Sequence, residues 1–156
     1  MRILSHLLLV MILGIIMTGC HPKIAQSPFT NFDNPELPSA PHYCLACPNC
    51  SGKRHIKTST YPLSAEQLKQ HWQTMIHDQP RTQKASDQGF KQRYIQRTAV
   101  FQFPDVIDVQ FKPVDHQHSQ LYILSQSVYG YYDFGKNCHR VKTWLNQLHQ
   151  QLTNHS

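Results

Sequence analysis

Three cysteines lie within seven residues of this 156-residue chain, at Cys44, Cys47 and Cys50, and a fourth, Cys138, lies near the far end. Cysteines in a C-x-x-C-x-x-C pattern can form disulfides, hold a metal or carry redox chemistry. Each use requires a different fold around the sulfur atoms, so this choice constrains the architecture more than any other feature. It depends on the compartment, because exported thiols become disulfides and cytosolic thiols stay reduced.

The first 20 residues predict export. MRILSHLLLVMILGIIMTGC carries one charged side chain, Arg2, and an unbroken apolar or glycine run from Leu7 to Met17. The run is too short for a bilayer, which takes about 20 apolar residues, and has the proportions of a secretory signal. The alternative is an uncleaved N-terminal anchor.

The last residues of this leader, MTGC, resemble the bacterial lipoprotein signal. The resemblance implies cleavage after Gly19, so that residues 1–19 are a signal peptide and Cys20 carries diacylglycerol and palmitate-type acyl chains. The residue after Cys20 is His21 rather than Asp, which resembles the class that is sorted to the outer membrane and faces the periplasm. The membrane is therefore the first expected partner.

Residues 20–41 are interpreted as the lipidated cysteine and a proline-rich tether. This stretch holds five of the ten prolines, few large aliphatic residues and no periodicity. Such a composition does not bury enough surface to fold alone, and a proline-rich linker extends by about 3.1 Å per residue. The alternative is that Phe29 and Phe32 dock on the domain.

Residues 42–156 form the predicted domain, with an amphipathic helix near each end. The first, over about 64–78, has a capping box at Ser64 and Gln67 and an apolar stripe. The second covers about 137–151. The two apolar stripes consist of Leu68, Trp72, Met75 and Ile76, and of Val141, Trp144, Leu145, Leu148 and Leu152.

Alternating segments between these helices predict strands, within residues 89–104, 105–114 and 120–130. In the second segment Ile107, Val109 and Phe111 share one face, and Asp108 and Gln110 share the other. The fold class is therefore α+β, with an antiparallel sheet of three to five strands and both amphipathic helices packed on one face.

Three motifs, CLACPNC, FPDVIDVQF and SQSVYGYYDFGKNCHRV, resemble in order and spacing those of a bacterial family known as domain of unknown function 1499. Many of its members are lipoproteins, and the resemblance covers about Tyr43 to Leu148. The family usually has arginine where this chain has Leu124 and Val128, so an anion site built on those positions is impaired here. Because the family has no assigned activity, the resemblance implies a fold and a location and no reaction.

The resemblance also implies a disulfide pairing. Cys44 and Cys50 occupy the family's own cysteine positions, whereas Cys47 and Cys138 stand where it has serine and often arginine. The expected pairs are therefore Cys44–Cys50 and Cys47–Cys138. A metal site completed by His42, His55 or the His116/His118 pair is the alternative, but thiolate ligands require reduced cysteine. We expect no metal and no cofactor.

The best candidate for a ligand site lies where a strand leads into the second helix. A helix start attracts anions, and Arg140 adds positive charge there. The candidate ligand-binding residues are Ser125, Ser127, Asp133, Asn137 and Arg140. The competing interpretation is structural: Asp133 or Asn137 caps the helix, and Gly130 and Gly135 serve the turn.

Catalysis has weaker support, and we assign no catalytic residue. A triad of Asp133, His139 and Ser125 or Ser127 is possible only on paper, since geometry and not sequence order defines a triad. The formal net charge of +6 is dispersed, and export argues against nucleic acid. The sequence therefore predicts an envelope lipoprotein with a non-catalytic binding or structural domain, whose partner is an envelope polymer or a small anionic ligand. The alternative is an enzyme or metal protein acting on an envelope component.

Overall fold

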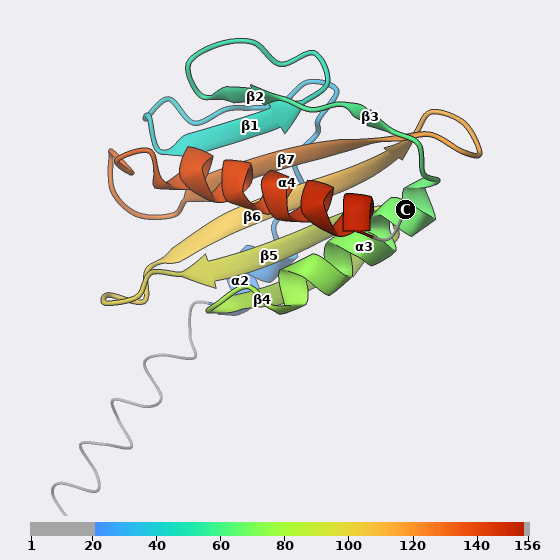
Figure 1. Cartoon of the computed structure of the whole chain (residues 1–156). Helices are drawn as coiled ribbons and strands as arrows, with labels where there is room; N and C mark the ends of the chain where they lie inside the picture. Colours follow the sequence, from blue (N-terminus) through green and yellow to red (C-terminus); the bar gives the residue numbers. More distant parts are fainter. Residues whose placement is uncertain (1–20, 155–156) are drawn as a thin grey trace, which may run out of the picture.

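The computed structural model describes residues 21–154 (Figure 1). The predicted signal peptide and the lipidated Cys20 lie outside these residues. Within them, the elements in chain order are α2 (His21–Gln26), β1 (Tyr43–Cys47), β2 (His55–Lys57), β3 (Thr60–Tyr61), α3 (Ala65–His77), β4 (Thr82–Gln88), β5 (Lys91–Arg97), β6 (Pro104–Pro113), β7 (Ser119–Ser127) and α4 (Lys136–Asn154). No helix in residues 21–154 has the length and apolar composition needed to cross a membrane.

The strands form one sheet in the order β2-β1-β7-β6-β5-β4, with β3 paired to β7. All pairs are antiparallel except β1 with β2. The α+β class is confirmed, but the described sheet has seven strands rather than three to five. The missed strands lack an alternating apolar pattern: β2 and β3 are three and two residues long, β4 is polar along its length, and β1 lies in the cysteine-rich stretch.

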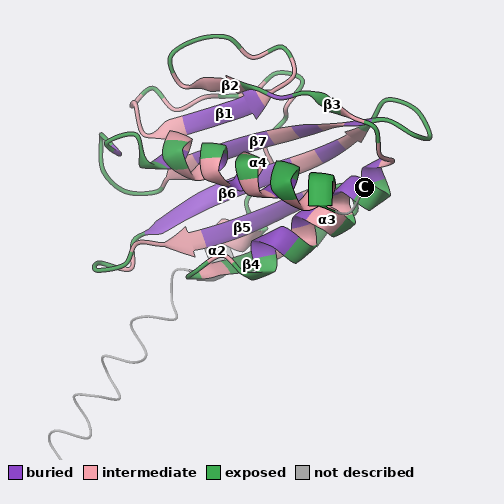
Figure 2. Ribbon diagram, in the orientation of Figure 1, coloured by how far each residue is buried: buried purple, intermediate pink, exposed green. Residues whose placement is uncertain are grey.

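Both predicted helices are present and pack on the same face of the sheet (Figure 1). At the start of α3, the Ser64 hydroxyl accepts from the backbone of Gln67 and the Gln67 side chain accepts from the backbone of Ser64, so the capping box is confirmed. Trp72 of α3 meets Trp144 of α4 edge-on, with ring centroids 5.9 Å apart. These rings lie in the core, which Figure 2 shows as the buried side of the strands and helices.

Alternation along β6 places the core as predicted. Ile107, Val109 and Phe111 are fully buried beneath the helices. Asp108 points to the opposite face, yet it is also buried, because that face is covered.

The cover on the second face is the segment predicted to be a free tether. The guanidinium of Arg93 donates from Nη1 to the carbonyls of Ile24 at 2.7 Å and Ser27 at 2.8 Å, and from Nη2 to the carbonyl of Pro28 at 2.8 Å. Its Nε pairs with Asp108 Oδ1 at 2.6 Å, and both side chains are only 3% exposed. A turn of chain thus offers three backbone carbonyls to a buried cation on the sheet.

Two aromatic residues hold the same segment down. The Phe29 ring lies 5.0 Å from the guanidinium carbon of Arg93, and the Phe32 ring lies 5.7 Å from that of Tyr122 on β7. The prediction of a free segment is therefore wrong for residues 24–33, and the alternative of docking through Phe29 and Phe32 describes them. The segment is also not extended throughout, because its first described residues form the short helix α2.

Candidate functional site

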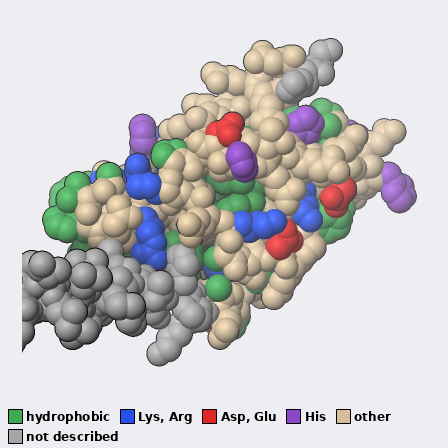
Figure 3. All heavy atoms as spheres, turned by 90° about the horizontal axis from the view of Figure 1, so that it is seen from below, with side chains coloured by type: hydrophobic (Ala, Val, Ile, Leu, Met, Phe, Trp, Pro, Cys, Tyr) green, Lys and Arg blue, Asp and Glu red, His purple; other side chains and the backbone are tan. Residues whose placement is uncertain are grey.

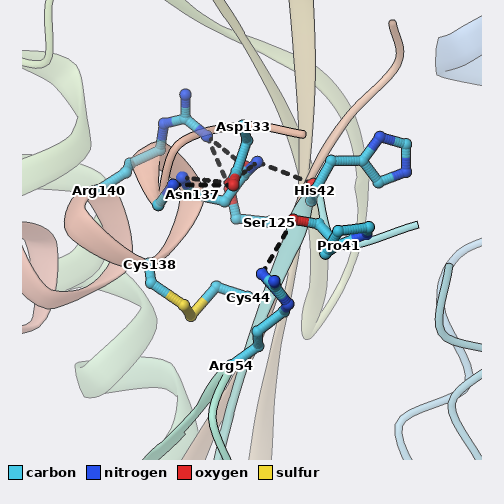
Figure 4. Close-up of a disulfide and its surroundings, with 10 residues drawn as sticks. Pro41, His42, Cys44, Arg54, Ser125, Asp133, Asn137, Cys138 and Arg140 are labelled. Atoms are coloured by element: carbon cyan, nitrogen blue, oxygen red, sulfur yellow. Dashed lines mark hydrogen bonds between the residues drawn. A yellow bond between two sulfur atoms is a disulfide. The ribbon is translucent and has the colours of Figure 1, made fainter. Parts of the chain in front are cut away.

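The five candidate ligand-binding residues come together where β7 ends and α4 begins (Figure 4). Ser125 and Ser127 lie on the helix-covered face of β7, Asp133 lies in the connecting loop, and Asn137 and Arg140 lie in the first turns of α4. The spacing of the two serines predicted that they share a face of the strand. The structure agrees, since both hydroxyls hydrogen-bond the side chain of Asn137.

Asn137 is the centre of the cluster and is fully buried. Its Oδ1 accepts from Ser125 Oγ at 2.7 Å and from Arg140 Nη1 at 2.7 Å. Its Nδ2 lies 2.8 to 3.0 Å from three acceptors, Asp133 Oδ2, Ser127 Oγ and the carbonyl of His42. One amide therefore ties the start of β1, the end of β7 and the start of α4 to one another.

Arg140 extends this network across the sheet. Besides Asn137, its Nη1 donates to Ser125 Oγ at 2.8 Å and its Nε to Gln96 Oε1 at 2.5 Å. Its Nη2 forms an ion pair with Asp105, whose side chain is 6% exposed against 10% for the guanidinium. Five donors in a fixed plane suit such a site, where three strands and a helix each supply an acceptor.

Sequence reasoning missed Asp105 and Gln96 as partners of Arg140. The position of Asp105 could have been predicted from the alternation of side chains along β6. Asp105 is two residues before Ile107, so it points to the same, helix-covered face as Ile107 and Val109. For Gln96 no comparable signal exists, since nothing in the sequence aligns the end of β5 with the start of α4.

Asp133 organises the first turn of α4. Its Oδ1 accepts from the backbone of Gly135 at 2.9 Å, and its Oδ2 accepts from the backbone of Asn137 at 3.0 Å. Burial raises the pKa of Asp133, but the hydrogen bonds from the backbone and side chain of Asn137 and from Gly135 outweigh it, so the pKa lies below its usual value. The carboxylate is thus held in its charged form and satisfies free N–H groups of the helix start.

A disulfide lies directly beneath the cluster, and it joins Cys44 to Cys138 (Figure 4). The second disulfide joins Cys47 to Cys50. All four cysteines in residues 21–154 are therefore paired as expected, but the expected partners Cys44–Cys50 and Cys47–Cys138 are wrong.

Strand geometry explains the observed pairing. Cys44 and Cys47 stand three residues apart on β1, so their side chains point to opposite faces of the sheet. Cys44 faces the helices and is fully buried, and so it meets Cys138 in α4. Cys47 ends the strand, and a turn closed by the Cys50 N–H to Cys47 carbonyl bond at 3.2 Å returns Cys50 to it.

Three of the four histidines considered as metal ligands make other contacts. The His42 ring lies 2.7 Å from the carbonyl of Gly130, the His55 ring 2.5 Å from that of Ser51, and the His118 ring 2.9 Å from a carboxylate oxygen of Asp115. Among residues 21–154, no three His, Cys, Asp or Glu side chains form a group that could hold a metal ion.

A shallow groove of about 590 Å³ opens beside Arg140. Arg81 and Lys136 give its wall a positive character, and His139 also lines it. Asn137 is buried and is not part of the wall. His139, which would be the base of the triad considered from the sequence, is exposed here. Within the described residues its ring has no hydrogen bond to Asp133 or to either serine.

The polar groups of the Asn137 cluster are hydrogen-bonded to one another. Their arrangement fixes the position of the β7–α4 loop relative to the start of α4.

Asn137→Ala should lower the free energy of unfolding by about 1–3 kcal/mol, because buried donors and acceptors around it lose their partner. Urea unfolding of the oxidised protein measures the change. Asn146→Ala is the matched control, since Asn146 is exposed on the same helix and should change stability by less than about 0.5 kcal/mol. Equal stability of the two variants would contradict a structural role for the network.

Comparison with known proteins gives one match. The model of a family described as "Protein of unknown function (DUF1499)" matches residues 33–148. The searches of curated proteins and of solved structures find no match. The matched span contains both disulfides and every residue of the Asn137 network.

Proposed function

The chain belongs to the DUF1499 family of proteins of unknown function, and on that premise we propose that it is an envelope-anchored lipoprotein whose domain is a non-catalytic binding or structural module. Its lipid anchor is Cys20, and its place is the outer membrane on the periplasmic side. The proposal joins the leader, which supplies export and lipid, to a domain held together by cross-links.

The observation that carries the non-catalytic part is the closure of the Asn137 network. Ser125 Oγ donates to Asn137 and accepts from Arg140, and Arg140 in turn is paired with Asp105. A nucleophilic serine requires a free approach to substrate and a base that takes its proton. Here the hydroxyl is fully buried and its neighbours are an amide and a guanidinium, neither of which accepts a proton.

Two disulfides support the exported location. Such bonds persist in the periplasm and are rare in the cytosol. One of them is buried in the core and the other closes a surface turn, so both the inside and the outside of the domain are oxidised.

The test is the intact mass of the protein purified from the membranes of the native cell. We expect a chain that begins at Cys20 and carries diacylglycerol and a fatty acyl chain, recovered in the outer-membrane fraction. Cys20→Ser is the control and should leave an unprocessed chain without lipid. A mature protein that lacks lipid, or a soluble cytosolic protein with free thiols, would refute the proposed anchor.

A further inference from the structure

Exposed apolar side chains gather in two loops at one end of the sheet. Of the ten large hydrophobic residues that are exposed in residues 21–154, eight lie in the β5–β6 loop or the β7–α4 loop. We call these eight the aromatic patch: Val100, Phe101, Phe103, Val128, Tyr129, Tyr131, Tyr132 and Phe134. The outermost, Phe134 and Val100, are 81% and 80% exposed, which is unusual for apolar groups clustered on a soluble domain.

The two loops form one surface. The Phe103 and Tyr129 rings, one from each loop, lie 5.6 Å apart, and the backbone N–H of Val128 donates to the carbonyl of Pro104 at 3.2 Å. Phe101 stacks on Phe103 with centroids 5.5 Å apart. In Figure 3, hydrophobic side chains gather at the left end of the molecule, with Lys or Arg side chains beside them.

The backbone itself presents one of these rings to solvent. Phe134 has a φ of 54°, in the left-handed region that bulky residues rarely adopt. Its ring contacts that of Tyr132 at 5.1 Å, edge to face, rather than turning into the core. The loop therefore keeps its aromatic groups outside.

The charge around the aromatic patch is positive. The two carboxylates nearest to it in the chain, Asp105 and Asp133, are buried and bonded to Arg140 and Asn137. The Arg54 guanidinium carbon lies 5.8 Å from the centroid of Tyr132, and Lys136 follows Phe134 by two residues.

Beyond these cations, the basic groove beside Arg140 continues from the patch. Phe134 and Arg81 both line that groove. There are two nearby acidic exceptions. The exposed Asp78, at the end of α3, has its carboxylate 3.1 Å from the ring of His77. The exposed Glu36 lines a groove together with Val128 of the patch.

We propose that the aromatic patch rests in the headgroup region of a phospholipid bilayer. Tyrosine and phenylalanine rings fit the boundary between headgroups and acyl chains, and cations at the rim pair with lipid phosphates. A buried protein interface does not need such cations at its rim. The inference rests on the proposed function for the nearness of the bilayer, and it adds an orientation: this end of the sheet faces the membrane.

The test uses the full lipidated protein, reconstituted in vesicles of phosphatidylethanolamine and phosphatidylglycerol with brominated acyl chains. Phe101→Trp supplies a reporter within the patch. The native Trp72 and Trp144 are buried in the core and contribute a constant background. Because interfacial groups lie about 5–10 Å into the boundary, we expect bromine to reduce the emission of the introduced tryptophan about twofold.

Val114→Trp is the matched control. Val114 is 55% exposed in the β6–β7 hairpin, at the opposite end of the sheet, and its replacement should not be quenched. Tyr131→Ser with Phe134→Ser, both highly exposed positions, should leave the melting temperature unchanged and reduce the quenching of Phe101→Trp.

The proposal would be overturned if Phe101→Trp and Val114→Trp were quenched equally. It would also be overturned if neither were quenched. A blue-shifted emission without quenching would mean that a second copy or another protein covers the patch, which also overturns it. Protein that stays with the vesicles but is not quenched refutes the patch alone. Protein that leaves the vesicles and lacks lipid in its mass refutes the anchor as well.

Discussion

Removing the Cys44–Cys138 disulfide by alanine replacement of both cysteines is expected to lower the free energy of unfolding by about 4–5 kcal/mol. The bond closes a loop of 94 residues in sequence, and the entropy that a cross-link removes from the unfolded chain grows with the length of that loop. For the same reason, removing the Cys47–Cys50 disulfide, with a separation of three, should cost about 2 kcal/mol.

Urea unfolding of the two double-alanine variants measures this difference. Both variants lack one disulfide and keep the other, so each is the control for the other. The Cys44–Cys138 variant should also lose more, because its alanines leave space in the core, whereas Cys47 and Cys50 lie at the surface turn. Equal losses, or a larger loss for the Cys47–Cys50 variant, would contradict the observed pairing.

Arg93→Met is expected to destabilise the protein by about 3–5 kcal/mol and to free the N-terminal segment. The substitution removes one partner of a fully buried ion pair and leaves the Asp108 carboxylate uncompensated. The carbonyls of Ile24, Ser27 and Pro28 lose their donor at the same time. The bonds from Thr30 to Asp108, both 2.8 Å, are too few to hold the segment without Arg93.

The measurements are urea unfolding and the rate of proteolytic cleavage within residues 21–34. Lys112→Met is the matched control, because it breaks the exposed Lys112–Asp33 pair between the same segment and the same sheet. An exposed pair contributes at most about 1 kcal/mol, so this variant should remain resistant. Cleavage of both variants at the wild-type rate would show that the segment is held by its aromatic contacts and not by Arg93.

The apolar periodicity of the helices and of β6 was sufficient to predict where they lie and which face each one buries. Leu68 and Trp72 on α3, and Val141 and Trp144 on α4, repeat at helical spacing because a single core lies beneath both helices. The edge strand β4 carries no such pattern. An edge strand in contact with solvent does not require apolar and polar residues to alternate. For this reason the sequence predicts no strand there.

The docked N-terminal segment could not be predicted from its composition, because what holds it belongs to the sheet. Arg93 and Asp108 are two polar residues on neighbouring strands, and their sequence does not show that their face is covered. Only the register of β5 and β6 places Arg93 opposite Asp108. The remaining donors of the Arg93 guanidinium then need acceptors, which the N-terminal segment supplies.

The five candidate residues lie together in the structure, but the disulfide beside them was paired incorrectly. The five residues named from sequence do form one cluster, because the glycine-rich turn after β7 brings the end of that strand to the start of α4. The pairing followed the family's cysteine positions. It did not use the alternation along β1, which points Cys44 and Cys47 to opposite faces of the sheet.

The arrangement of the cysteines along the chain sets a problem of timing. Synthesis from the N-terminus makes Cys44, Cys47 and Cys50 long before Cys138, so three thiols are close together while the partner of one is still missing. Only the Cys47–Cys50 bond among them belongs to the finished molecule. Any bond that Cys44 makes early must be broken again by thiol–disulfide exchange before α4 can be locked to β1, so correct assembly depends either on the early arrival of the last helix or on this exchange.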